Sequence, residues 1–295
     1  EEPQIINPNQ ALSQPIQSIQ TKQKNGRDQI TISFGSPNRN IVVLNFKPNN
    51  IEKATNIAEQ FLQNQAGTIF IAADTNKEEI LVFNSKNPFN FYDVFHRIEN
   101  ISDQQVFGIL TKPDNSETYS VIIGVAGSAG WAKHHYGYLE RYLEMGFAVF
   151  SLHSSKSRGV ESTVGEQLTV TIPMMIYDSF MALNKLSEDQ NIDASRAGLT
   201  GWSLGGGVTL FSAWSPIQEA ISPNLKFAAH LPFYPPCIIM PDELIFNNVP
   251  MVFNMSNNII KRIFNTFYKT FHYIEIRSLE TCIGYIPHFY HLSCL

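Results

Sequence analysis

From about residue 80 onward, short apolar runs alternate with stretches of helical periodicity, and this alternation leaves the chain few possible folds. Such alternation predicts a mostly parallel sheet with helices on both faces. The runs typical of buried strands are YSVIIGVAG, FAVFSL, RAGLTGW, KFAAHLPFY, VPMVFNM and YIEIRS. Two earlier runs, EEILVFN and QQVFGILTKP, are interpreted as antiparallel strands at the start of the domain. The sequence therefore predicts a doubly wound α/β domain over residues 80–295.

The residues before this domain have a different character. Residues 1–28 are rich in Gln, Asn and Pro and show little apolar periodicity, so we expect a flexible lead-in. Residues 29–79 predict a small β-α-β accessory segment, in which a helix presents Ile51, Ala54 and Phe61 on one face. This segment carries no recognisable chemistry and is interpreted as a packing unit.

Composition and charge narrow the class of function. The net charge is −5 and no long basic run occurs, which disfavours a nucleic-acid partner and favours a small, weakly polar substrate. No apolar run reaches the roughly 18 residues that a membrane span needs. Three cysteines without CxxC spacing predict no metal site, and we expect no cofactor. The composition is that of a soluble protein, either cytoplasmic or exported. Because the chain begins at Glu1 and not at a methionine, we expect either that a signal peptide has been removed or that the sequence is a fragment.

One short motif points to chemistry. Residues 201–205, GWSLG, match the pattern G-x-S-x-G between a predicted strand and a predicted helix. A strand that turns at once into a helix forces Ser203 into a strained conformation, and Gly201 and Gly205 avoid the collisions that result. The same turn could bind phosphate or have no function, but its place in a βαβ alternation favours a catalytic nucleophile.

A second glycine-rich loop, GVAGSAG, follows an earlier buried strand and should lie at the same edge of the sheet. Acyl transfer needs two N–H donors directed at the developing oxyanion. We expect one from Leu204, directly after the nucleophile, and the other from Ser128, with Gly127 allowing the close approach. An ordinary turn between a strand and a helix would also require glycines here.

With these motifs in place, residues from about 80 to 255 resemble the dienelactone hydrolase family of α/β-hydrolases. The resemblance covers about three fifths of the chain and rests on GVAGSAGWA, YLEMGFAVFSLHSSKSRGVEST, the stretch from MMIYDSF to GWSLGGGV, and FAAHLPFYPPC. It implies an α/β-hydrolase fold and metal-free cleavage of esters or lactones through an acyl-enzyme. Original members of the family use a cysteine nucleophile, and here Ser203 holds that position.

A serine nucleophile needs a histidine base, which in this fold follows it in the chain. The histidines after Ser203 are His230, His272, His288 and His291. His230 and His272 fall in predicted strands, which favours structural roles. His288 stands in the loop after the last predicted strand, where the family places its base, and His291 is its competitor.

The acid that should orient the base is harder to find. The family expects an aspartate shortly after VPMVFNM, where this chain has Asn257 and Asn258. Asp242 is our candidate substitute, since no aspartate follows it; Glu275 and Glu280 are weaker alternatives. The C-terminal residues also lack the family's usual loop, so the domain is expected to have an atypical or truncated C-terminus.

Together these features predict a serine hydrolase that cleaves small carboxylic esters or lactones, with Ser203, His288 and Asp242 as its catalytic residues. The alternative is an α/β-hydrolase-fold binding protein with weak or no activity. The aromatic residues near the site, Trp131, Trp202, Phe233 and Tyr234, would line a pocket or fill the core. His153, at the end of a predicted strand, either borders the site or has no function.

Overall fold

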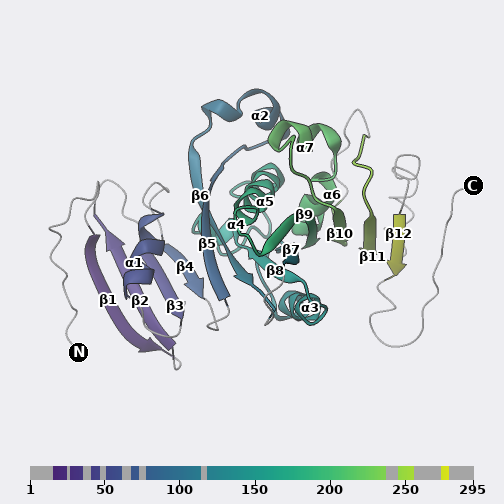
Figure 1. The fold of residues 1–295 in the computed structure, drawn as a ribbon. Coiled ribbons are helices and arrows are strands. Elements are labelled where there is room, and N and C mark those ends of the chain that lie inside the picture. Colours follow the sequence, from purple (N-terminus) through teal and green to yellow (C-terminus); the bar gives the residue numbers. More distant parts are fainter. Residues whose placement is uncertain are drawn as a thin grey trace, which may run out of the picture.

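Two β-sheets lie side by side in the computed structural model, the smaller built by the N-terminal part of the chain (Figure 1). The structure describes residues 16–24, 27–35, 41–46, 51–61, 68–72, 78–113, 118–236, 245–255 and 274–278.

The larger sheet has eight strands in the order β12-β11-β10-β9-β7-β8-β6-β5. Their bounds are β5 (Glu78–Lys86), β6 (Asp103–Thr111), β7 (Tyr119–Val125), β8 (Ala148–Leu152), β9 (Ile192–Trp202), β10 (Ala229–Phe233), β11 (Met251–Met255) and β12 (Ile274–Ser278). β6 pairs antiparallel with both β5 and β8, and every other neighbouring pair is parallel. The predicted mostly parallel sheet with two antiparallel strands at its start is confirmed.

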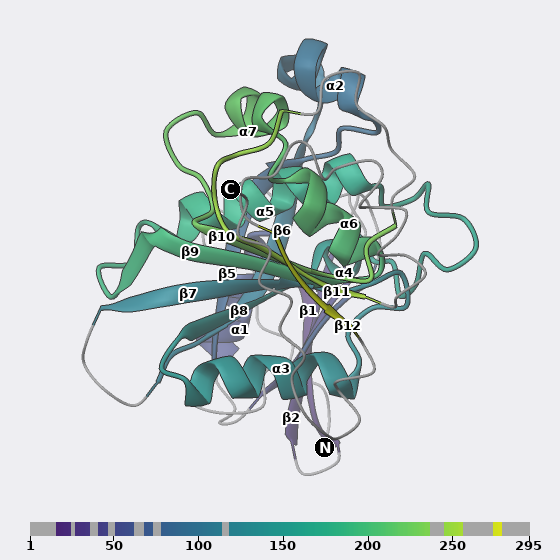
Figure 2. The ribbon, with the colours of Figure 1, turned by 90° about the vertical axis from the view of Figure 1, so that its right-hand side faces the viewer.

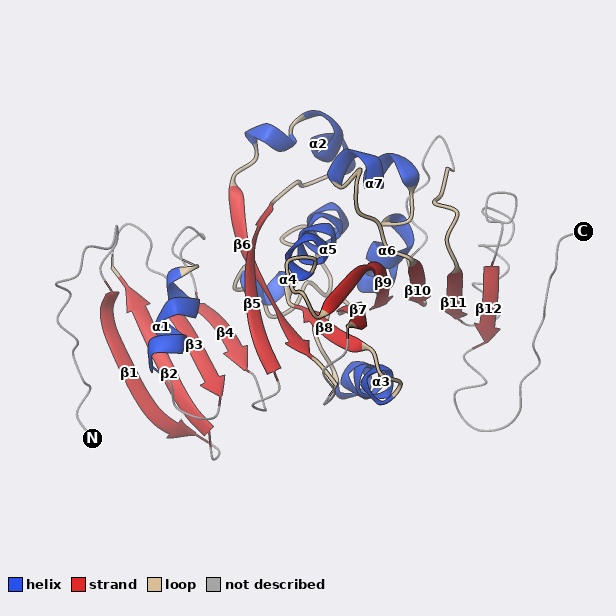
Figure 3. Ribbon diagram, viewed as in Figure 1, coloured by secondary structure: helices blue, strands red, loops and turns tan. Residues whose placement is uncertain are grey.

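Helices cover both faces of this sheet. α3 (Lys133–Glu144) lies on one face, while α5 (Ile172–Leu186) and α6 (Leu204–Phe211) lie together on the other (Figures 2 and 3). All five residues of β8 are buried, as expected for a parallel strand enclosed from both sides. Short elements that are not predicted from the sequence are α2 (Phe91–His96), the 3₁₀ turn η1 (Ile98–Asn100), α4 (Ser154–Ser157) and α7 (Ser215–Ile221). Each is too short to show a helical period.

The smaller sheet has the order β1-β2-β3-β4. Its elements are β1 (Ile16–Lys24), β2 (Arg27–Phe34), β3 (Ile41–Phe46), α1 (Ile51–Glu59) and β4 (Thr68–Ala72), and we call residues 16–72 the N-terminal unit. β3 and β4 are parallel with α1 between them in the chain, which confirms the predicted β-α-β segment.

The expectation of a flexible lead-in over residues 1–28 is wrong for residues 16–24, which form β1. β1 pairs antiparallel with β2 along its length; Ile19 is buried in the core of the N-terminal unit, and Ile16 packs against that core. The side chains of residues 17, 18 and 20–23 are polar and at least partly exposed, so the strand depends on backbone pairing and shows little apolar signal.

The N-terminal unit shares one hydrophobic core with the larger sheet. Phe61, just after α1, contacts Phe107 of β6 edge to face, with ring centroids 6.0 Å apart. Val149 of β8 packs in the cluster around Leu139 of α3, so it points to the face of the sheet that α3 covers. Thr111 of β6 pairs with Val149 and points to the same face. Phe107 lies four residues before Thr111 in β6 and therefore also points to this face. The N-terminal unit therefore covers β5 and β6 on the face where α3 covers β7 and β8.

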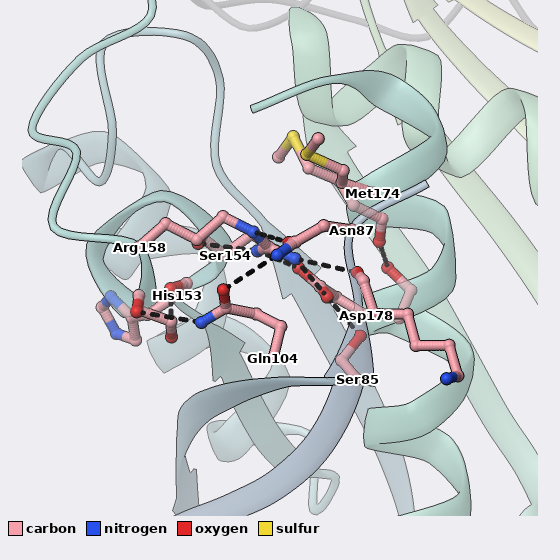
Figure 4. A network of polar contacts seen from close by, with 12 residues as sticks. Ser85, Asn87, Gln104, His153, Ser154, Arg158, Met174 and Asp178 are labelled. Atoms are coloured by element: carbon pink, nitrogen blue, oxygen red, sulfur yellow. Dashed lines mark hydrogen bonds and ion pairs between the residues drawn. The ribbon is translucent and has the colours of Figure 1, made fainter. Parts of the chain in front are cut away.

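A buried ion pair joins the outer strands to the helices (Figure 4). The Arg158 guanidinium holds the Asp178 carboxylate through two bonds, Nη1 to Oδ2 at 2.7 Å and Nη2 to Oδ1 at 3.0 Å. The Ser85 hydroxyl of β5 also donates to this carboxylate, at 2.5 Å. The other three guanidinium donors bond the Asn87 side chain and the carbonyls of Lys86 and Ser154. All five N–H groups of Arg158 are thus paired, which offsets the cost of burying the charge.

Replacing Asp178 with alanine should lower the free energy of unfolding by about 3–5 kcal/mol, because the variant leaves the Arg158 charge buried without its partner. Urea unfolding of the parent and the variant measures this difference. The matched control is Glu188→Ala, which removes the exposed partner of Lys185 and should cost less than about 1 kcal/mol. Equal losses in the two variants would contradict this reading of the ion pair.

Candidate active site

The order of the strands places a site at the carboxyl ends of β7 and β9. From β7 the chain passes through α3 to β8 on one side, and then through α5 to β9 on the other side of β7. Ligands of open α/β sheets bind where the strand order reverses in this way, outside the carboxyl ends. Two of the predicted segments, the loop after β7 and the turn after β9, meet at this point.

The turn after β9 holds Ser203 in a strained conformation. β9 ends at Trp202 and α6 begins at Leu204, so Ser203 alone makes the reversal, with φ 53° and ψ −114°. Its side chain is exposed between two buried neighbours. A non-glycine residue in such a conformation costs on the order of 1–3 kcal/mol and persists only where its surroundings fix it. Here the Ser203 N–H donates to the Phe233 carbonyl at 3.1 Å, and the Ser203 carbonyl accepts from the Gly207 N–H at 3.0 Å.

Gly201 and Gly205 are required by close contacts, as predicted. A Cβ on Gly201 would lie 2.1 Å from the Gly205 carbonyl oxygen, and a Cβ on Gly205 would lie 2.2 Å from the Val125 carbonyl oxygen. These separations are shorter than any real Cβ contact. The second contact also shows that the first turn of α6 packs against the end of β7.

The loop after β7 lies directly beside Ser203. The Gly130 N–H donates to the Gly127 carbonyl at 2.9 Å, which closes a tight turn over residues 127–130. A Cβ on Gly127 would lie 3.3 Å from the Cβ of Ser203. The structure thus brings together four of the predicted site residues: Gly127, Ser128, Ser203 and Leu204. Leu204 is the first residue of α6, where N–H groups lack partners within the helix.

Residues 162–167 hold Ser128, a feature that sequence reasoning missed. The Ser128 carbonyl accepts bonds from the Thr163 N–H at 2.9 Å and the Ser162 hydroxyl at 3.2 Å. The Gln167 amide donates to the Ser128 hydroxyl at 3.3 Å, and Gln167 has a positive φ of 50°. The segment between α4 and α5 therefore fixes the loop that carries Ser128. Its polar sequence has no period that could reveal this contact.

The four aromatic residues singled out in the sequence pack in one cluster. Trp202 and Phe233 are buried and stack on one another at 5.4 Å, so they belong to the core beneath the turn. His135 of α3 stacks on Trp202 at 4.6 Å. Burial, with a smaller effect of the His134 charge, lowers the pKa of His135 to about 4. Trp131 and Tyr234 are partly buried at the edge of this cluster.

The remaining proposed catalytic residues, His288 and Asp242, lie outside the described residues, as does the competitor His291. Within the described ranges the Ser203 hydroxyl has no hydrogen-bonding partner. His230 of β10 is buried, and its Nδ1 lies 3.0 Å from the Thr209 carbonyl of α6, a contact that fits the predicted structural role. Burial lowers the pKa of His230 to about 4.

Within the part of the chain that the structure describes, no three His, Cys, Asp or Glu side chains gather closely enough to hold a metal ion. Among the same residues, no helix has both the length and the apolar character needed to cross a membrane.

Comparison with known proteins gives a result at the level of the fold. No family model matches the chain, and no curated protein is significantly similar to it in sequence. A protein assigned as a dienelactone hydrolase from Klebsiella pneumoniae superposes with a TM-score of 0.50 at 15% identity, over 68% of this chain and 85% of its own. A protein designated m3DLH gives a TM-score of 0.50 at 13% identity, over 69% of this chain and 82% of its own. With the strand order and helix placement described above, this similarity establishes that the chain has the α/β-hydrolase fold.

Proposed function

We propose that the chain is a serine hydrolase that cleaves small carboxylic esters or lactones through an acyl-enzyme. The observation that carries the proposal is the turn at Ser203, an exposed hydroxyl on a strained residue beside the Gly127–Gly130 loop. Residues strained in this way cluster at active sites. The Klebsiella pneumoniae protein with a similar structure is described as a dienelactone hydrolase, which is in keeping with the proposal.

In the proposed reaction the Ser203 Oγ attacks the carbonyl carbon of the ester while His288 takes its proton. The carbonyl π electrons move to oxygen, and the N–H groups of Leu204 and Ser128 stabilise the oxyanion that forms. The intermediate collapses, the bond to the alcohol oxygen breaks, and His288 returns the proton to that oxygen. A water molecule then gives a proton to His288 and attacks the acyl carbon. The bond from this carbon to the Ser203 Oγ breaks, His288 returns the proton to Oγ, and the acid is released. Asp242 would orient His288 and stabilise its charged form.

The alternative function is binding without turnover. It is favoured by the sequence after β11, where Asn257 and Asn258 stand at the place of the family's aspartate. A neutral amide does not stabilise a charged imidazolium as a carboxylate does. The two functions differ in whether Ser203 reacts with a phosphonate that mimics the transition state.

A fluorophosphonate probe should label the parent protein at Ser203, read by mass spectrometry of the modified peptide. Ser203→Ala should abolish labelling because the nucleophile is gone. His288→Ala should slow it by roughly 10²-fold or more because the base is gone. Ser195→Ala is the matched control, since Ser195 is an exposed residue in the part of β9 remote from the turn. A folded parent that stays unlabelled would contradict the hydrolase proposal and favour a binding role.

Gln167→Ala should lower kcat about five- to tenfold on a p-nitrophenyl ester with KM within about twofold, because it removes one hydrogen bond that positions Ser128. Gln167→Glu should restore part of the rate, since the carboxylate can accept a bond from the Ser128 hydroxyl. The control Gln190→Ala changes an exposed glutamine before β9 and should leave both constants unchanged. An effect of Gln167→Ala confined to KM would show that Gln167 does not position the oxyanion donor.

A further inference from the structure

One side chain of α3 contacts both segments that form the candidate active site. His135 lies in the first turn of this helix and is 4% exposed. Its Nδ1 accepts a hydrogen bond at 3.1 Å from the N–H of Ala132, which follows the loop that carries Ser128. Its ring stacks on Trp202, the residue directly before Ser203, with centroids 4.6 Å apart and planes at 28°. The imidazole is therefore in contact with the segment after β7 and with the turn after β9.

The bond from Ala132 explains part of the choice of residue at position 135. Ala132 is the residue just before α3, and a side chain three places later commonly accepts a bond from the N–H of this capping residue. In α2 the carboxylate of Asp93 fills the same role. A carboxylate would cap α3 equally well, but it could not stack on an indole ring. A histidine provides both the acceptor and the flat ring.

The stack on Trp202 bears on the position of Ser203. Trp202 is 1% exposed and also stacks on Phe233, with centroids 5.4 Å apart and planes at 22°. The Phe233 carbonyl is the group that accepts the Ser203 N–H. The residue before Ser203 and the acceptor of its N–H thus pack in one aromatic cluster, and His135 joins this cluster from α3.

The two segments also touch directly, through their backbones. A Cβ on Gly127 would lie 2.9 Å from the Trp202 carbonyl oxygen. Trp131, between this loop and α3, donates its Nε1–H to the Leu152 carbonyl of β8 at 3.0 Å, and its ring contacts the His135 ring edge to face at 5.8 Å. His135 therefore adds a second link between segments that already meet at Gly127, and this link is made by side chains.

The link depends on a neutral imidazole. A protonated Nδ1 would direct its own N–H at the Ala132 N–H, close to the positive end of the α3 dipole. Burial, with a smaller effect of the His134 charge, lowers the pKa of His135 to about 4, so the acceptor is available at neutral pH. The His134 ring centroid is 3.9 Å away, whereas two further rings in contact with His135, those of Trp131 and Trp202, do not titrate.

We propose that His135 is a positioning residue of the candidate active site, which fixes the oxyanion donor loop relative to Ser203 by linking Ala132 to Trp202. The donors stabilise an oxyanion only if they are directed at the oxygen of the carbonyl that Ser203 attacks. A displacement of about 1 Å can cost on the order of 10²-fold in rate. His135 acts here through its two neighbours and not on the substrate. The inference rests on the proposed function.

Two substitutions each remove one half of the link. His135→Phe keeps a ring against Trp202 but has no acceptor for the Ala132 N–H, and His135→Asn keeps an acceptor but has no ring. With p-nitrophenyl butyrate at pH 8, each should lower kcat about five- to tenfold and change KM by less than about twofold. In both variants the substrate contacts remain while the donors lose their fixed position.

The matched control is Val42→Ala, which removes buried apolar volume from the core of the N-terminal unit. It should lower the urea midpoint of unfolding but leave kcat as in the parent. A kcat within about twofold of the parent value in both His135 variants would overturn the positioning role, however much stability they lose. An effect confined to KM would overturn it as well.

Hydrogen–deuterium exchange read by mass spectrometry needs no substrate and so separates failure of this inference from failure of the proposed function. His135→Phe should speed exchange about tenfold in peptides covering residues 127–132, and His135→Asn should do so in peptides covering 202–207. Peptides of α5 should exchange as in the parent. If the parent cleaves no ester while these local changes are present, the hydrolase proposal fails and the link stands. An equal rise in all three regions would assign His135 to general stability and overturn the inference.

Discussion

The buried pair of Arg158 and Asp178 links the parts of the molecule that the site needs. Asp178 belongs to α5 and Arg158 follows α4, while the same guanidinium bonds carbonyl groups at the end of β5 and within α4. Two charges in a protein interior are tolerated only where every donor and acceptor finds a partner, and this cluster meets that condition for the guanidinium. The pair thereby fixes α4 relative to the sheet. α4 and His153, the residue before it, line a small cavity together with Gly127 of the loop beside Ser203.

At the carboxyl ends of the strands in the larger sheet, two residues with strained backbones are held by hydrogen bonds to the neighbouring strand. Ser203 has a φ of 53° after β9, and Tyr234 has a φ of 36° after β10. The Ser203 N–H donates to Phe233 of β10, and the Tyr234 N–H donates to the Asn254 carbonyl of β11 at 2.7 Å. Each strained residue is therefore tied to the next strand along the sheet. Strain of this kind survives because the surrounding hydrogen bonds leave no relaxed alternative, and here they form a ladder across three strands.

The sequence predicts those features that depend on repeated or local patterns. The alternation of apolar runs predicts the larger sheet, and the spacing of glycines around Ser203 predicts the turn, because both leave a regular pattern along the chain. β1 is not predicted because only Ile16 and Ile19 among its residues are apolar, and its structure comes from pairing with β2. The hydrogen bonds from residues 162–167 to Ser128 could not be predicted for a similar reason. They join two polar loops that are distant in sequence and show no periodic pattern. The lowered pKa of His153 likewise results from burial that no local pattern reveals.

Burial also decides which of the described histidines could act as a general base at neutral pH. A general base works best with a pKa near the working pH, and burial lowers the pKa values of His135, His153 and His230 to about 4, 3 and 4. These three side chains are therefore weak bases at neutral pH, suited to stacking and to neutral hydrogen bonds. The other two described histidines, His96 and His134, are exposed on α2 and α3, and both precede Ser203 in the chain. In this fold the base follows the nucleophile, which is why the proposed mechanism takes His288 as the base.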